Sequence, residues 1–124
     1  RRLAEAPDDA VLLTQRGIAP TGDWITPDLT NGWTDFGEPY APVGYRMHPG
    51  SLVEIQGLMK GGAMNTPAFT LPAGYRPAHR LLFPSIGGDN GAARCDITPD
   101  GTVIPATGNT GYLTLDAIRF TATR

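Results

Sequence analysis

The residue types that commonly carry catalysis or hold metals are few in this chain and far apart. Its two histidines, His48 and His79, have no cysteine, aspartate or second histidine at the spacing of a zinc site. The chain has neither the Gly-x-Ser-x-Gly motif of a nucleophilic serine nor a phosphate-binding loop. Residues 89–91 (DNG) and 100–102 (DGT) offer oxygen ligands but lack the further acids of a calcium loop. We therefore predict no catalytic residue, no metal and no cofactor.

Paired carboxylates are the one remaining route to an enzyme. Asp35, Glu38 and Glu54 are the candidates for a cell-wall polysaccharide hydrolase. Such an enzyme holds two acids about 5–10 Å apart across a cleft. Nothing in the spacing of these three acids demands that geometry, so we expect a protein that is not an enzyme and keep the hydrolase as a minor alternative.

Aromatic residues are the more informative set, because sugar rings stack on exposed aromatic faces while polar neighbours bind the hydroxyls. Tyr40 lies in a proline-rich loop and is the best candidate for an exposed platform. The other candidate ligand-binding residues are Trp24, Tyr112, Asp89, Asn90 and Asn109. The opposing interpretation is burial, since large rings dominate protein cores. We expect burial for Trp33, Phe36, Phe69, Phe83 and Phe120.

The single cysteine, Cys95, cannot form an internal disulfide. It falls on the same strand face as Ala93 and Ile97, and we predict a buried apolar side chain rather than a reactive thiol. The lack of disulfides fits assembly in a reducing cytoplasm.

Length and composition favour one β-rich domain. The chain has 124 residues, 16 of them glycine and 12 proline, which argues for short strands and tight turns rather than a helical bundle. The net charge of −2 and the scattered basic residues argue against binding to nucleic acid. No apolar run is long enough to enter a membrane. Because the chain starts at Arg1 rather than methionine, we expect it to be part of a longer protein.

Residues 1–21 differ from the remainder and predict a junction from an upstream shaft or domain. Pro7 and Asp8 are typical of a helix start, and Gly17 is a plausible stop. A helix of one or two turns would need a partner surface, because it is too short to be stable alone.

Residues 22–124 predict an all-β domain, an antiparallel β-sandwich or jelly roll. Short strands at near-regular spacing, without a helix between them, favour antiparallel pairing. The clearest strand is 51–60, where Gly57 indicates a bulge or close packing. Residues 99–101 (PDG) are the strongest hairpin signal. We predict strands at 24–26, 33–36, 43–47, 51–60, 68–71, 80–84, 92–98, 102–104, 112–115 and 118–121.

Residues 69–77 (FTLPAGYRP) form the stretch around which the chain is organised. Phe69 and Leu71 alternate on one strand face, and Pro72 ends the strand because it cannot donate to a sheet ladder. The following Ala-Gly pair supplies a turn, and we expect Tyr75 and Arg76 to brace this corner.

This stretch resembles a motif of small β-rich domains near the C-termini of bacteriophage and prophage tail-fibre and minor tail proteins. The resemblance extends over residues 22–124. Five further segments are similar to the same family, in the same order: 32–37 (GWTDFG), 42–46 (PVGYR), 53–62 (VEIQGLMKGG), 96–103 (DITPDGTV) and 115–120 (LDAIRF).

The resemblance implies a virion structural protein, the distal head of a tail fibre or tail-tip protein. Such a head would assemble as a homotrimer with other tail proteins in the host cytoplasm. Outside the cell it would attach to a host-surface receptor, expected to be a saccharide, by many weak contacts. Residues 87–91 and 107–111 would form its distal rim. A purely architectural trimerisation or capping domain is the alternative, and a carbohydrate-binding module of a secreted bacterial protein is a further one.

Overall fold

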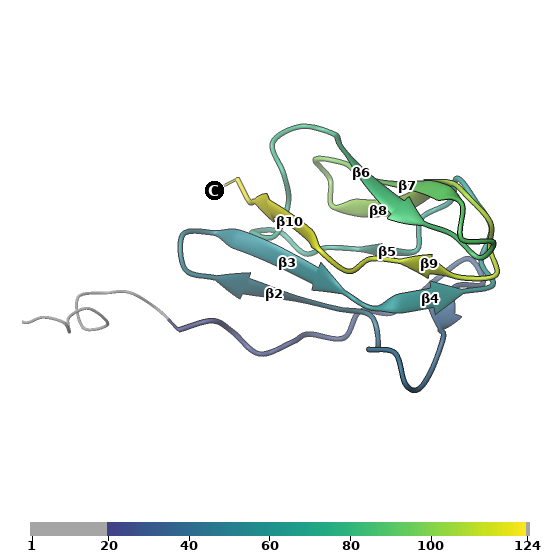
Figure 1. Cartoon of the computed structure of the whole chain (residues 1–124). Helices are drawn as coiled ribbons and strands as arrows, with labels where there is room; N and C mark the ends of the chain where they lie inside the picture. Colours follow the sequence, from purple (N-terminus) through teal and green to yellow (C-terminus); the bar gives the residue numbers. More distant parts are fainter. Residues whose placement is uncertain (1–19, 124) are drawn as a thin grey trace, which may run out of the picture.

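The computed structural model of the protein describes residues 20–123, and the predicted helical junction therefore lies outside the described residues except for Pro20 and Thr21. Within that range the chain is all-β and antiparallel, which confirms the predicted fold class (Figure 1). The strands are β1 (Thr34–Asp35), β2 (Gly44–His48), β3 (Leu52–Gln56), β4 (Leu58–Lys60), β5 (Phe69–Thr70), β6 (Leu81–Ile86), β7 (Ala92–Ile97), β8 (Thr102–Thr107), β9 (Leu113–Thr114) and β10 (Ile118–Thr121).

The strands form two layers. One layer is the four-stranded sheet β5-β8-β7-β6. The other contains two three-stranded sheets, β10-β3-β2 and β1-β4-β9, which run on into each other because β4 follows β3 and β10 follows β9 (Figure 1). An isolated bridge between Gly87 and Leu113 joins the end of β6 to β9, so the layers meet at that edge.

The core lies between the layers and follows from the period-two pattern of the strands. In β3, Val53 and Ile55 are fully buried while the residues between them are partly exposed. Phe120 pairs with Val53 on the neighbouring strand and turns its ring to the same side. The largest fully buried side chains are Trp33, Phe69, Ile55, Met59, Leu71, Ile97, Leu113, Leu115, Val43, Val53 and Val103.

Gly57 separates β3 from β4, as the sequence predicts. Its φ of +121° is open to glycine and strained for other residues. Its amide donates to Asp116 Oδ1 at 2.8 Å, and its carbonyl accepts from the Leu115 amide at 2.8 Å. These two bonds hold the break in the strand against the β9–β10 connection.

The two predicted turns around β5 and β8 are also confirmed. The hairpin after β7 closes through a bond from the Gly101 amide to the Thr98 carbonyl at 2.9 Å. At the corner after β5, Arg76 Nε donates to the Leu71 carbonyl at 2.8 Å. Tyr75 packs edge-to-face against Tyr45, with ring centroids 5.3 Å apart. Both side chains therefore brace the corner.

Three sequence expectations need correction. The strand predicted at 24–26 is a single bridge from Ile25 to Tyr45, because Pro27 ends the pairing. Strand β6 continues through Pro84 to Ile86, which an edge strand tolerates. Phe36 and Phe83 are only partly buried, because each lies where the core opens to the surface.

Candidate binding site

A surface hollow of about 350 Å³ brings together three of the predicted ligand-binding residues, Tyr40, Asn90 and Tyr112. We call it the Tyr40 hollow. Its full lining is Phe36, Tyr40, Leu58, Ile86, Asn90, Tyr112, Thr114 and Asp116. Its volume is near the lower end of the range for small-molecule sites, about 300–1,000 Å³.

Phe36 is the centre of an aromatic cluster in this hollow. Its ring lies edge-to-face with Tyr40 at 5.3 Å and with Tyr112 at 6.3 Å between centroids. Tyr40 is 50% exposed, so it presents ring surface to solvent. Lys60 Nζ lies 5.2 Å from the Phe36 centroid, within the range of a cation–π contact. Phe36 is thus held between the rings of Tyr40 and Tyr112, and the cluster is open to solvent at Tyr40.

Local backbone bonds position these rings. The Phe36 amide donates to the Leu58 carbonyl at 2.9 Å, which ties the end of β1 to β4. Gly37 has a φ of +104°, and its carbonyl accepts from the Tyr40 amide at 3.0 Å. This tight turn brings Tyr40 back over Phe36.

The polar side of the hollow comes from the other end of the chain. The Tyr112 hydroxyl donates to Asn90 Oδ1, which leaves the Asn90 amide nitrogen available as a donor. Asp116 Oδ1 accepts from the Gly57 amide, and the second carboxylate oxygen has no hydrogen-bond partner among residues 20–123. An amide donor and a carboxylate acceptor thus flank exposed ring surface.

The remaining predicted site residues lie outside the hollow. Asp89 Oδ1 accepts from the Gly91 amide at 2.9 Å, and Asn109 Oδ1 accepts from the Gly111 amide at 2.7 Å. Each therefore shapes its own turn. The two loops also pack together, since the Gly88 amide donates to the Asn109 carbonyl at 3.2 Å. Asp89 and Asn109 support the Asn90 side of the hollow without lining it.

Trp24 lies on the layer of β2 and β3, where the Arg46 guanidinium stacks on its ring at 4.1 Å. Arg46 Nε also donates to Glu54 Oε1 at 3.0 Å, and His48 Nε2 lies 2.6 Å from the same oxygen. Arg119 reaches the other oxygen of Glu54 at 3.1 Å. The hydrogen bond with His48, together with those from the two arginines, lowers the pKa of Glu54 to about 2. Trp24 and Glu54 thus belong to a structural ion-pair network.

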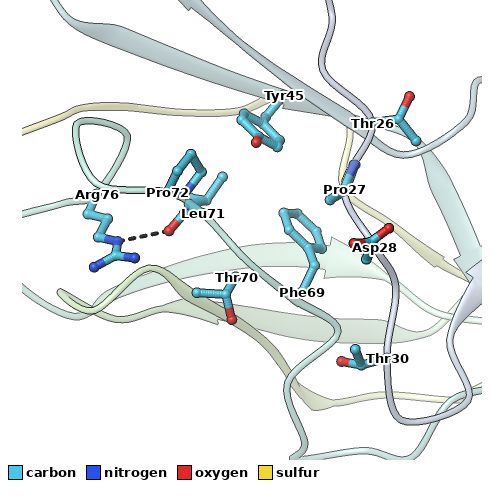
Figure 2. Close-up of a pocket in the computed structure, with 10 residues that line it drawn as sticks. All are labelled: Thr26, Pro27, Asp28, Thr30, Tyr45, Phe69, Thr70, Leu71, Pro72 and Arg76. Carbon is cyan, nitrogen blue, oxygen red and sulfur yellow. Dashed lines mark hydrogen bonds between the residues drawn. The ribbon is translucent and has the colours of Figure 1, made fainter.

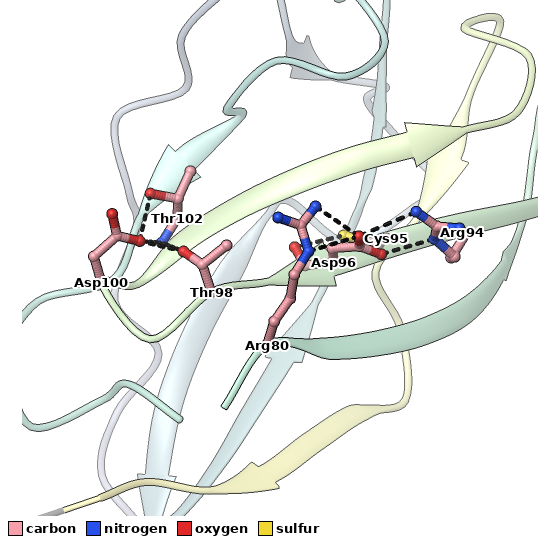
Figure 3. Close-up of polar contacts among 7 residues, drawn as sticks. All are labelled: Arg80, Arg94, Cys95, Asp96, Thr98, Asp100 and Thr102. Atoms are coloured by element: carbon pink, nitrogen blue, oxygen red, sulfur yellow. Dashed lines mark hydrogen bonds and ion pairs between the residues drawn. The ribbon is translucent and has the colours of Figure 1, made fainter. Parts of the chain in front are cut away.

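A second ion-pair network lies on the outer face of the four-stranded sheet (Figure 3). Asp96 is fully buried beneath Arg80 and Arg94, which approach it at 2.8 and 2.9 Å. Burial alone would raise the pKa of Asp96, but the hydrogen bonds from the two arginines outweigh it and hold the pKa below its usual value. In the neighbouring turn, hydrogen bonds from Thr98 and Thr102 lower the pKa of Asp100. Residues 98–102 are thus organised by turn chemistry.

The acids considered for hydrolysis have separate structural surroundings. Asp35 Oδ1 accepts from the Val43 amide at 2.9 Å, and Glu54 is held by the network on β2, β3 and β10. Glu38 is exposed in the loop after β1. None of the three lines the Tyr40 hollow. Among residues 20–123, no cluster of three or more histidine, cysteine, aspartate or glutamate side chains is placed to hold a metal.

Cys95 is fully buried, as predicted. Burial, with a smaller effect from the Asp96 charge, raises the pKa of its thiol to about 12. Among the same described residues, no helix has the length and apolar character needed to cross a membrane.

Sequence reasoning missed five lining residues: Phe36, Leu58, Ile86, Thr114 and Asp116. The sequence predicts Phe36 to be a core residue, because large rings dominate protein cores. Ile86 and Asp116 carry no local signal, since their roles depend on the bridge between β6 and β9 and on the bond from Asp116 to Gly57.

A comparison with known proteins identifies a solved structure of similar fold. No protein-family model and no curated protein matches the sequence. Among solved structures, the chain is similar to the receptor binding protein (gp15) of Listeria phage PSA, with a TM-score of 0.74 and 16% sequence identity. The similarity covers 93% of this chain and 73% of that protein. The resemblance to phage tail-head domains inferred from the sequence is therefore confirmed in fold.

Proposed function

We propose that this chain is the receptor-binding head module of a phage tail fibre or tail-tip protein, and that it attaches to host-surface saccharide through the Tyr40 hollow. The observation that carries the proposal is the meeting of Tyr40, Asn90 and Tyr112 in one hollow. These residues come from three separate loops, and each is a candidate ligand-binding residue on the sequence alone.

The chemistry of the hollow suits a sugar unit. The half-exposed Tyr40 ring offers a flat apolar face, and the Asn90 amide and Asp116 carboxylate can bind hydroxyl groups. A shallow site with few polar contacts predicts weak binding by one copy. Several copies on one particle would multiply that affinity, because each later contact becomes intramolecular.

The structural likeness to a phage receptor binding protein supports an attachment role. On this proposal the chain belongs to the tail of a virion, assembles with other tail proteins in the host cytoplasm and acts outside the cell. The arrangement of the chain supports this: the purple start of the described chain and the end of β10 lie at one end of the molecule, and the loops after β6 and β8 lie at the other (Figure 1). An upstream shaft joined at the first end would present those loops outward.

We propose a homotrimer as the working assembly, with the outer face of β6 in the subunit contact. Leu82 and Ile86 are 58% and 51% exposed on that face, with Pro84 between them. Exposed apolar side chains in one row are typical of an interaction surface. Because Ile86 also lines the Tyr40 hollow, a neighbouring subunit would stand close to the bound sugar.

A purely architectural capping module is the second candidate. It would share the fold and the trimer but leave Tyr40 without a ligand. A hydrolase would need two acids facing each other across a cleft, and Asp35 and Glu54 instead accept hydrogen bonds within the fold. Binding, not catalysis, is therefore the activity we propose.

The test measures attachment of the full chain, fluorescently labelled, to cells and to purified cell-wall polysaccharide from candidate hosts. We expect Tyr40→Ala to reduce retention at least about tenfold, the effect of roughly 1.4 kcal/mol. Ile25→Ala is the matched control, because Ile25 is 39% exposed and does not line the hollow. Equal retention by the Tyr40→Ala variant would contradict the assigned site. Failure of the unmodified protein to bind any host surface would favour the architectural module.

A further inference from the structure

A second hollow, of about 440 Å³, lies between the segment before β1 and the corner after β5 (Figure 2). We call it the Tyr45 hollow. It shares no residue with the Tyr40 hollow. Its lining is Thr26, Pro27, Asp28, Thr30, Tyr45, Phe69, Thr70, Leu71, Pro72 and Arg76. Residues more than forty positions apart therefore build one concave surface.

Tyr45 supplies the most informative polar group in this hollow. Its side chain is only 7% exposed, yet its hydroxyl has no hydrogen-bond partner among residues 20–123. Figure 2 shows this hydroxyl directed toward the space between Arg76 and Asp28. Burial, with Tyr75 nearby, raises the pKa of Tyr45, so the hydroxyl keeps its proton and can donate. The hydroxyl oxygen is not sealed from solvent, since the buried polar side-chain atom that lacks a partner among residues 20–123 is Trp33 Nε1. The Tyr45 hydroxyl is therefore accessible to an external hydrogen-bond partner in the hollow.

The walls of the hollow carry further unused groups. No hydrogen bond or ion pair from residues 20–123 reaches the Asp28 carboxylate. Arg76 uses Nε for the Leu71 carbonyl, which leaves its two terminal amino groups free of partners among the same residues. Figure 2 shows Asp28 and Arg76 on opposite sides, with Phe69 between them. One negative and one positive side chain make the lining neutral overall.

These features define the ligand by its chemistry. A carboxylate can accept hydrogen bonds from two neighbouring hydroxyls, and a guanidinium can donate two in parallel. The ring edges of Tyr45 and Phe69 and the ring of Pro72 supply apolar contact. A neutral lining does not favour a strongly charged ligand. We propose that the Tyr45 hollow is a second binding site, for a neutral hexose unit held by Asp28, Arg76 and the Tyr45 hydroxyl.

The existence of this site rests on the geometry of the hollow, whereas the choice of a sugar rests on the attachment function proposed above. With both sites in one chain, a single head would contact two sugar units of the same surface polymer. Each trimer would then offer six contacts.

The test is an NMR titration of the full, ¹⁵N-labelled chain with methyl glycosides of neutral hexoses. Concentrations up to about 20 mM cover millimolar Kd values. We expect the amide signals of residues 26–30 and 70–76 to shift with at least one glycoside. Asp28→Asn and Tyr45→Phe should each weaken that binding about fivefold to tenfold, because the first replaces one carboxylate acceptor by an amide donor and the second removes a hydroxyl donor, while both leave the backbone bonds intact. Asp23→Asn, which alters an exposed carboxylate outside the hollow, is the matched control.

The outcomes separate the two sites. Shifts at residues 26–30 that persist in Tyr40→Ala would support the second site even if host attachment through the Tyr40 hollow failed. The absence of shifts with every hexoside would overturn the proposal. Unchanged affinity in both Asp28→Asn and Tyr45→Phe would do the same.

Discussion

Gly57 lies so close to Val43 that a Cβ atom on Gly57 would stand 2.5 Å from the Val43 Cα. The contact is between backbones, so neither residue can move aside cheaply. We expect Gly57→Ala to destabilise the fold by about 3 kcal/mol or more, through overpacking and a strained φ of +121°. Urea unfolding measures the loss. Gly50→Ala is the matched control, because Gly50 also has a positive φ but has open space around its Cβ position, and it should lose only about 1 kcal/mol.

The network around Glu54 predicts a pH dependence. The pKa of Glu54 is lowered from 4.5 to about 2, so the ionised carboxylate is more stable in the folded protein than in the unfolded chain. The stabilisation is therefore complete above about pH 4.5 and is lost as the pH falls toward 2. Glu54→Gln should reduce the free energy of unfolding by about 2 kcal/mol at pH 7, allowing for solvent screening. The two proteins should converge by about pH 2, and a constant difference across that range would contradict the assignment.

Cys95 should be inert in the folded protein. Its thiol is fully buried and its pKa is raised to about 12, so almost no thiolate exists at pH 8. A coloured aromatic disulfide reagent should react with it only after unfolding in concentrated urea. A Cys95→Ala, Thr121→Cys protein provides the comparison, since Thr121 is exposed on β10 and the new thiol should react at once. Rapid reaction of Cys95 in the native protein would show that its surroundings open readily.

The row of Leu82 and Ile86 predicts how the subunits associate. We expect light scattering to give three times the monomer mass, and Leu82→Glu to lower that mass toward the monomer. A charge buried at a subunit contact lacks a partner, whereas the same charge on a free surface is solvated. Ile25→Glu, on the other layer, should leave the trimer intact. A monomer at every concentration would remove the self-sufficient trimer, although an upstream shaft could still impose the symmetry.

The fold could largely be predicted from the sequence because its turns are marked locally. Pro72 ends a strand because it lacks an amide donor, and Gly57 and Gly101 each adopt a positive φ that favours glycine. The residue type alone therefore indicates these turns. The same local signals failed at residues 24–26, where one bridge to Tyr45 takes the place of a strand. Pro27 limits the segment to that one bridge, and how far the pairing extends before the proline depends on β2, which the local sequence does not specify.

The candidate site was only partly predictable. The sequence marks Tyr40 by its proline-rich loop, Asn90 by its glycine-rich loop and Tyr112 as an aromatic residue at the start of a predicted strand, yet nothing in the sequence says that these three segments meet. Their meeting depends on the register of β4 with β9 and on the bridge at Gly87. Trp24 is the opposite case. The sequence marks it as a candidate for ligand binding, but in the structure the Arg46 guanidinium stacks on its ring. The unpartnered Tyr45 hydroxyl could not be found without three-dimensional contacts.

Pro84, in the middle of β6, has a further consequence under the proposed attachment function, in which many heads share one particle. Strand β6 ends the order of its sheet, and a regular, apolar edge strand is a template for amyloid-like pairing between molecules. Proline has no amide hydrogen, so the series of donors along β6 is interrupted between Leu82 and Ile86. Side chains can therefore meet across this face while backbone ladders between neighbouring copies are discouraged. Heads concentrated on one particle would remain separate folded units rather than fusing into continuous sheets.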